Sequence, residues 1–212
     1  MSMEQSGLFN MKQAIVNPSI EISMKEEELV TLNVNLNGVI VQDDNMARAR
    51  IGNSTIYLIN NQWSSEEVLS YIHRCANSVS GEKKRALNDL RIALMYLNDC
   101  KINFKGSIAF MYHFGIKQAF RGSRLTKPFL WLMGKALKET IKVDGILLQA
   151  YPVGLYAVNE IPSLQRRLEN IYQKSGFALL KAKKMVVKSS EGYVINHMFC
   201  DVRNKSFEQF SV

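Results

Sequence analysis

Three basic side chains gather in a short turn ahead of a helix. In the segment QAFRGSRLTKPFLWLMGKAL, Arg121, Arg124 and Lys127 flank a glycine turn, and Thr126 begins an apolar-periodic helix of about residues 127–142. The first backbone N–H groups of a helix have no partner within the helix, and the helix dipole favours negative charge there. Such a turn suits the phosphates of a bound cofactor. It equally suits nucleic acid, or an ordinary connection with solvated basic side chains.

The basic character of the chain belongs to its C-terminal half. The 212 residues carry a net charge of +8. Residues 1–60 hold four Lys and Arg against seven Asp and Glu, whereas residues 101–190 hold sixteen against four, a balance of +12. This excess predicts an anionic ligand or partner on that half, such as a phosphate-bearing cofactor, nucleic acid or an acidic protein surface. Solvated lysines are the plain alternative.

The composition is that of a soluble globular protein. Hydrophobic residues make up 47% of the chain and charged residues 22%, which is enough apolar surface for a core. No apolar run approaches the roughly 18 residues of a membrane span, and the start MSMEQSGLFN lacks the apolar core of a signal peptide. We therefore expect a cytoplasmic protein without membrane association. Cys75, Cys100 and Cys200 form no CxxC pattern, so we expect reduced cysteines that pack in the core.

The first 60 residues are rich in strand patterns. LVTLNVNLNGVIV (29–41) alternates apolar and polar residues, as a half-buried strand does. ARARIGNSTIYLIN (47–60) alternates on both sides of Gly52-Asn53, which predicts a hairpin turn at that dipeptide. We expect residues 1–53 to form a strand-rich N-terminal extension packed on a main domain of residues 54–212.

Helix and strand patterns alternate after residue 60. The first helix pattern opens with a capping box made by Ser64 and Glu67. Gly115 interrupts the first strand pattern, where a glycine often marks a bulge or a close backbone approach. The order predicts an α/β fold with a mixed central sheet flanked by helices. The expected helices span 64–78, 81–100, 127–142 and 163–175, and the expected strands span 106–120, 145–151, 177–188 and 193–202.

Two motifs in this order resemble the Gcn5-related N-acetyltransferase (GNAT) superfamily. They are FRGSRLTKPFLWLMGKAL, an aromatic-Arg-Gly turn before a helix, and LENIYQKSGFALL, a helix ending in Tyr-x-Lys-x-Gly-Phe. The resemblance covers about residues 105–202. It implies a GNAT-like acyl-CoA N-acyltransferase fold, which binds acetyl-CoA as acyl donor in a cleft between two splayed parallel strands. The implied acceptor is an amine on a small molecule or a protein.

The resemblance also implies roles for particular residues. The turn and helix start would hold the pyrophosphate, and the backbone from Phe114 to Ile116 would align the pantetheine and polarise the thioester carbonyl. Tyr172 matches the tyrosine that protonates the leaving thiolate, with packing against the sheet as its alternative role. The implied cofactor-binding residues are Phe114, Ile116, Arg121, Gly122, Ser123, Arg124, Leu125, Thr126 and Lys127.

The sequence departs from the family pattern at several positions. Arg124 and Thr126 stand where the family's turn, Gln/Arg-x-x-Gly-x-Gly/Ala, has small residues, and Gln165 stands where the family often has Asn. Only about twenty residues separate the second helix from the basic turn, a space in which the family fits three antiparallel strands. Either the N-terminal strands fill the missing places or the acceptor side is remodelled.

His113 is the candidate base of the central strand. No acidic residue lies between Lys101 and Lys138, so this histidine is the titratable group that remains there. We name His113 and Tyr172 as candidate catalytic residues, with a core or edge position as the alternative for the histidine. The three histidines show no metal-ligand spacing, and no metal site is expected.

Three functions are compatible with the sequence. The first is an acyl-CoA-dependent N-acyltransferase in which an amine attacks the acetyl thioester directly. The second, ranked close behind, is a catalytically inactive GNAT-like fold that acts as a binding or structural protein. The third is a nucleic-acid-associated basic protein, in which aromatic residues such as Phe129 and Trp131 would stack on bases beside the basic side chains.

Overall fold

Seven strands form one sheet in the computed structural model, which describes residues 14–25, 29–42, 45–59, 65–102, 106–121, 124–152, 158–182, 186–188, 192 and 194–203. Their order across the sheet is β1-β2-β3-β4-β5-β7-β6, and only the pair β4 and β5 is parallel. The strands are β1 (Ala14–Lys25), β2 (Thr31–Gln42), β3 (Asn45–Ile59), β4 (Ser107–Ile116), β5 (Val143–Ala150), β6 (Ala178–Leu179) and β7 (Asn196–Asp201).

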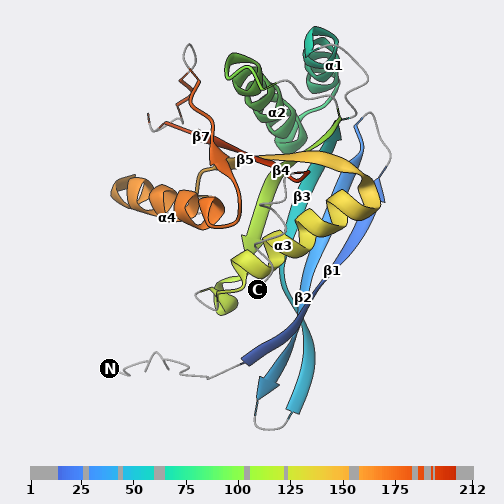
Figure 1. The fold of residues 1–212 in the computed structure, drawn as a ribbon, viewed down its shortest axis with the longest axis vertical. Coiled ribbons are helices and arrows are strands. Elements are labelled where there is room, and N and C mark those ends of the chain that lie inside the picture. The colour runs from blue at the N-terminus through green and yellow to red at the C-terminus, as the bar shows by residue number, and fades with distance from the viewer. Residues whose placement is uncertain are drawn as a thin grey trace, which may run out of the picture.

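Helices cover both faces of this sheet. The α-helices of the described chain are α1 (Ser65–Ser78), α2 (Gly81–Asp99), α3 (Thr126–Ala136) and α4 (Ile161–Gln173). α1 and α2 lie on one face, whereas α3 and α4 lie on the other (Figure 1). The predicted α/β fold with a mixed central sheet flanked by helices is confirmed. Short helical turns occupy Gln118–Phe120, Leu137–Ile141 and Val158–Glu160.

Each face of the sheet has its own apolar core. The period-2 alternation of β2 places Leu32, Val34 and Leu36, each at most 1% exposed, in one cluster with Phe129 of α3. On the other face, the apolar side of α2 packs with Phe110 of β4. Burying each such side chain contributes about 1.5–3 kcal/mol. These two cores hold the sheet between its helix layers.

The predicted hairpin at Gly52-Asn53 is wrong. β3 runs unbroken through both residues and pairs antiparallel with β2 on one side and β4 on the other. The chain reverses earlier, where Gln42 pairs with Asn45. The glycine has a different reason: a Cβ at Gly52 would lie 2.1 Å from the carbonyl oxygen of Gly115 in β4. Here glycine permits a close approach of two backbones.

The N-terminal strands extend the main sheet. β1, β2 and β3 form an antiparallel meander whose last strand pairs with β4, so they fill the places left by the short segment after α2. β3 also crosses the expected boundary between residues 53 and 54. The division into a 1–53 extension and a 54–212 domain stays a prediction about folding units.

The parallel strands β4 and β5 separate at their carboxyl ends. Their pairing runs from Ser107↔Val143 to Met111↔Leu148 and then stops, although β4 continues to Ile116. At this point Tyr112 is an extra residue, because Met111 and His113 pair with consecutive residues of β3. A β-bulge of this kind bends a strand. The element order and the splayed parallel pair are those that the GNAT resemblance implies, so the chain has a GNAT-like fold.

Several predicted boundaries differ from the structure. The third helix ends as a π-helical turn at 137–141, and the two final strands shorten to β6 and β7, with an isolated bridge between Lys188 and Val194. Ser64, the first residue of the expected capping box, lies outside the described residues. The three cysteines are free thiols, two of them buried, as expected for packing residues. Among the described helices, none combines the length and the apolar character needed to cross a membrane.

Candidate functional site

A cavity of about 570 Å³ opens where β4 and β5 separate. We call it the β4–β5 cavity. One wall is the end of β4 and the turn that follows, as far as Thr126 at the start of α3. The other walls are Tyr151 and Pro152, which follow β5, and the face of α4 that carries Leu164 and Leu168. Segments far apart in the sequence therefore meet in one hollow on the α3–α4 face of the sheet.

Most of the predicted site residues line this cavity. Lys127 lies in the first turn of α3 but is not in the lining, whereas Gly122 and Ser123 fall outside the described residues. The structure thus brings the basic turn, the central strand and the Tyr-x-Lys-x-Gly-Phe helix together; the roles of their residues stay predictions. The predicted residues that line the cavity are His113, Phe114, Ile116, Arg121, Arg124, Leu125, Thr126 and Tyr172.

The turn before α3 has an unusual backbone. Arg124 adopts φ = 58°, in the left-handed region that favours glycine. This is the position at which the family pattern has its first glycine, and its backbone has a conformation that glycine adopts more easily than arginine. Leu125 occupies the N-cap of α3 and has no side-chain oxygen with which to cap it. The start of α3 therefore faces the cavity without a competing side-chain cap.

The lining of the cavity is strongly basic. Lys117, Arg121, Arg124 and Arg167 line it, and its described lining contains no Asp or Glu. Arg121 donates from Nε to the carbonyl oxygen of Ile116 over 3.3 Å, which ties the turn to the end of β4. Four cationic side chains around one hollow, together with a helix N-terminus, create a positive potential that suits a phosphate-bearing ligand.

The end of β4 offers backbone groups to the cavity. From Tyr112 to Ile116, β4 has β3 on one edge, and the described chain places no strand on its other edge. The buried Ser54 of β3 donates from Oγ to the carbonyl oxygen of His113 over 2.6 Å, which fixes the backbone just after the bulge. Unpaired strand edges bind extended ligands through main-chain hydrogen bonds.

The two candidate catalytic side chains differ in their surroundings. Tyr172 is 6% exposed and packs its ring against Phe177, with centroids 5.9 Å apart. Burial raises the pKa of Tyr172 to about 12, so the hydroxyl stays protonated at neutral pH. His113 is half-buried, and its imidazole lies over Gly115, where a Cβ would stand 2.8 Å from Nε2. Both residues line the same cavity.

Sequence reasoning missed part of the lining. Arg167 belongs to a stripe on α4 with Leu164, Leu168 and Ile171, at the i, i+3, i+4 and i+7 spacing of one helix face. This helical spacing in the sequence could have identified these residues of α4 as one wall of a site. Gln165, the position of the family's Asn, is not in the lining; its amide donates to the carbonyl oxygen of Val194 over 2.9 Å.

The described residues contain no group of three or more His, Cys, Asp and Glu side chains that would hold a metal ion. The groups that the cavity offers to a ligand are its cations, its backbone groups, Tyr172 and His113.

No protein-family model matches the chain, and no curated protein matches it. It is similar to the solved structure of the Drosophila melanogaster polyamine N-acetyltransferase, which catalyses the formation of N-acetylagmatine (10% identity, 78% of this chain and 74% of that chain, TM-score 0.48). It is also similar to arylalkylamine N-acetyltransferase 2 from Aedes aegypti (13% identity, 80% and 73%, TM-score 0.48). A third is FeeM, an N-acyl amino acid synthase from uncultured soil microbes (9% identity, 89% and 93%, TM-score 0.44).

Proposed function

We propose that this protein is a divergent GNAT enzyme that transfers an acyl group, most simply acetyl, from acyl-coenzyme A to an amine. The observation that carries the proposal is the β4–β5 cavity. It lies where two parallel strands separate, and it is lined by four cationic side chains and the start of α3. Its volume of about 570 Å³ falls within the roughly 300–1,000 Å³ typical of ligand sites.

The residues of the cavity fit the parts of acetyl-coenzyme A. Arg121, Arg124 and the N–H groups at the start of α3 would hold the pyrophosphate, with Arg167 facing them from α4. The free edge of β4 from Phe114 to Ile116 would bind the amides of the pantetheine arm. When bound, acetyl-coenzyme A supplies the activated acyl group as a thioester.

In this proposal His113 and Tyr172 handle the protons of the reaction. His113 would take a proton from the attacking amine, since the described part of the cavity lining has no carboxylate for that task. Tyr172 would donate a hydrogen bond to the leaving sulfur, since a tyrosine hydroxyl is protonated across the physiological range. The half-buried wall around both groups limits the access of water.

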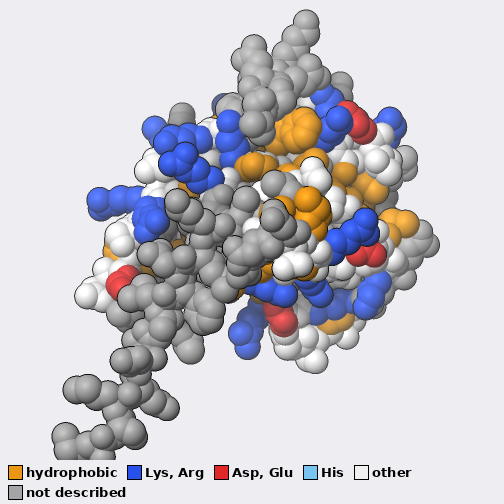
Figure 2. All heavy atoms as spheres, turned by 90° about the horizontal axis from the view of Figure 1, so that it is seen from below, with side chains coloured by type: hydrophobic (Ala, Val, Ile, Leu, Met, Phe, Trp, Pro, Cys, Tyr) orange, Lys and Arg blue, Asp and Glu red, His pale blue; other side chains and the backbone are white. Residues whose placement is uncertain are grey.

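An inactive GNAT-like binding protein is the second candidate. Arg124 at φ = 58° favours it, because a guanidinium stands where the family has only a backbone N–H and an α-carbon. A nucleic-acid partner ranks third. Seen from below, the Lys and Arg side chains form separate groups around apolar and uncharged side chains (Figure 2), whereas a nucleic-acid surface concentrates them in a patch or stripe.

A thermal-shift titration with acetyl-coenzyme A tests the proposal. Ligand at a hundredfold excess over its Kd should stabilise the protein by about 2.7 kcal/mol, which raises the Tm by roughly 5–10 °C for a chain of this size. Arg121→Ala combined with Arg124→Ala should abolish the shift. Arg74→Ala combined with Arg166→Ala removes the same charge outside the cavity lining and should preserve it. The absence of any shift at millimolar acetyl-coenzyme A would contradict the enzyme proposal.

A further inference from the structure

A second stripe of side chains runs along α4, next to the stripe that faces the cavity. Gln165, Glu169 and Tyr172 follow one another at the i, i+4 and i+7 spacing of one helix face. Tyr172 lines the β4–β5 cavity, whereas Gln165 and Glu169 are not in its lining. Because the backbone hydrogen bonds of a helix make it turn as one body, contacts that hold Gln165 and Glu169 also set the direction of Tyr172.

Glu169 accepts two amide hydrogen bonds on one carboxylate oxygen. Asn196, at the start of β7, donates from Nδ2 to Glu169 Oε1 over 2.6 Å. Gln165 donates from Nε2 to the same oxygen over 3.1 Å. A hydrogen bond to an ionised acceptor is roughly twice as strong as one between neutral groups. The short contact from Asn196 therefore ties α4 to β7.

The Gln165 amide also binds the chain just before β7. Its Nε2 donates to the carbonyl oxygen of Val194 over 2.9 Å, in addition to its bond with Glu169. Gln165 is buried, so the two hydrogens of this amide have protein partners in place of water. Val194 and Asn196 thus contact α4 at two positions that lie one helical turn apart.

The start of β7 is itself fixed in the sheet. Asn196 pairs with Ala150 at the end of β5, and His197 pairs with Gln149. The buried ring of His197 stacks on Tyr96 of α2, and its Nε2 lies 3.2 Å from the amide nitrogen of Gln149. Successive side chains of a strand point to opposite faces. Asn196 therefore reaches α4 from a strand whose next residue is anchored against α2.

These contacts connect two walls of the β4–β5 cavity. Tyr151 and Pro152, which directly follow β5, form one wall, and Arg167 stands on the α4 wall. β7 pairs with the end of β5 and holds α4 through Asn196. The position of the α4 wall relative to β5 therefore depends on side chains that lie outside the cavity.

We propose that Asn196 and Glu169 are positioning residues of the β4–β5 cavity. Their hydrogen bond sets the rotation of α4 about its axis, and with it the direction of Arg167 and Tyr172. The part of this inference that concerns the acyl donor rests on the proposed function, whereas the positioning of α4 does not. A displacement of about 1 Å far from the chemistry can cost roughly 10²-fold in rate, so a contact outside the lining can control the site.

A reciprocal exchange of the two side chains tests the contact. Asn196→Asp places a second carboxylate against Glu169, so repulsion replaces the hydrogen bond. The Kd for coenzyme A, measured by isothermal titration calorimetry at a temperature at which the variant is folded, should rise about tenfold. Adding Glu169→Gln lets the new amide donate to the new carboxylate, and the double variant should bind within about threefold of the wild type. An unchanged Kd in Asn196→Asp, or no recovery in the double variant, would overturn the proposal.

Two control variants separate positioning from general effects. Asn170→Asp adds the same charge to α4 at an exposed position outside the lining, and Cys200→Ala removes buried volume from β7 away from the contact. Cys200→Ala should lower the Tm, and both controls should keep the Kd for coenzyme A within about twofold of the wild type. If either control raises the Kd as much as Asn196→Asp does, charge or stability explains the effect and the proposal is wrong.

Hydrogen exchange distinguishes a failure of this inference from a failure of the acyl-transfer proposal. Without ligand, Asn196→Asp should speed the exchange of the α4 amides, and the double variant should restore their protection. If the wild type does not bind coenzyme A but the exchange follows this pattern, the positioning of α4 stands and the acyl-transfer proposal falls. If coenzyme A binds equally well to the wild type and to Asn196→Asp, the acyl-transfer proposal stands and this inference falls.

Discussion

At the residue scale, the basic turn places a non-glycine residue in a backbone conformation that favours glycine. Arg124 adopts φ = 58°, a conformation that costs an L-residue roughly 1–2 kcal/mol. In return, its guanidinium lines the β4–β5 cavity, where a bidentate contact to a phosphate would compensate for the loss of close backbone approach. The sequence pattern identified this turn because basic residues and a helix start are local signals. No local sequence pattern indicated that Arg124 would adopt a left-handed φ.

The ring and the hydroxyl of Tyr172 have different proposed roles: the ring packs in the core, and the hydroxyl takes part in catalysis. Tyr172→Phe keeps the ring that packs against Phe177 and removes only the hydroxyl. We expect a kcat at least tenfold lower, in keeping with the about 10²–10⁴-fold contribution of a positioned acid or base, and an unchanged acetyl-coenzyme A thermal shift. His113→Gln should behave in the same way if the imidazole is the base. If either variant retains the full kcat, the substituted residue has a packing role and no catalytic role.

At the element scale, β3 positions the part of β4 that borders the cavity. Gly52 permits the close approach, and Ser54 holds the carbonyl of His113. The hairpin prediction at Gly52-Asn53 failed because alternation around a glycine looks the same in a turn and in a strand with a close neighbour. That neighbour, Gly115, lies far along the chain. The two family motifs, by contrast, each lie within one turn and one helix, and these were found.

The close approach at Gly52 makes a testable difference between two glycines. In Gly52→Ala the new Cβ would meet the backbone oxygen of Gly115, which cannot move without displacing β4, whereas in Gly115→Ala it would meet the end of the His113 side chain. We expect Gly52→Ala to lower the free energy of unfolding by about 2–3 kcal/mol, clearly more than Gly115→Ala. Urea denaturation measures both. Equal losses would show that β4 tolerates the displacement.

At the scale of the whole molecule, the sheet contains a buried histidine that makes stability depend on pH. His197 of β7 is fully buried, stacks on Tyr96 with centroids 4.3 Å apart, and lies 3.2 Å through Nε2 from the Gln149 amide nitrogen. Burial lowers the pKa of His197 from 6.5 to about 4. The folded state therefore favours the neutral ring, and folding loses stability as the pH falls.

The pH window follows from these two pKa values. The stabilising contribution of neutral His197 is complete above pH 6.5 and is lost as the pH falls through about 4, a total of about 3 kcal/mol. We expect the urea midpoint of the wild type to fall between pH 7 and 4, and that of His197→Gln to start lower and fall less. Parallel pH profiles for the two proteins would assign the acid loss to other groups.

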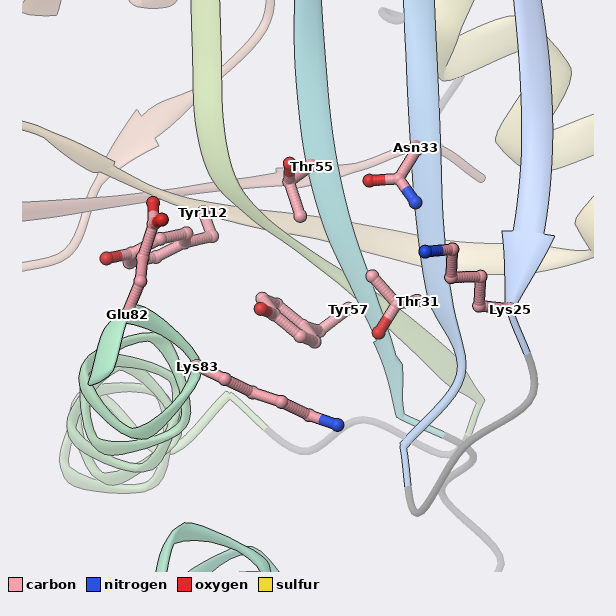
Figure 3. Close-up of a pocket in the computed structure, with 8 residues that line it drawn as sticks. All are labelled: Lys25, Thr31, Asn33, Thr55, Tyr57, Glu82, Lys83 and Tyr112. Carbon is pink, nitrogen blue, oxygen red and sulfur yellow. The ribbon is translucent and has the colours of Figure 1, made fainter. Parts of the chain in front are cut away.

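Local motifs predicted the β4–β5 cavity, but no local signal predicted the smaller cavity of about 260 Å³ beside the start of α2, which Tyr57 and Tyr112 help to line (Figure 3). Its side chains come singly or in pairs from β1, β2, β3, β4 and α2, and the strands involved acquire a common face only through sheet register. No sequence motif that indicates a ligand lies next to Lys25 or Tyr112 in the chain. Such a site becomes visible only once β1 and β2 are placed beside β3 and β4.

The bulge at Tyr112 divides β4 into two parts. Before the bulge the strand is paired on both edges, with β3 and with β5, whereas after it the described chain pairs only the β3 edge, from His113 to Ile116. The first part therefore belongs to the core of the sheet, and the second part borders the β4–β5 cavity. One added residue thus allows the end of β4 to change without disturbing the paired strand behind it.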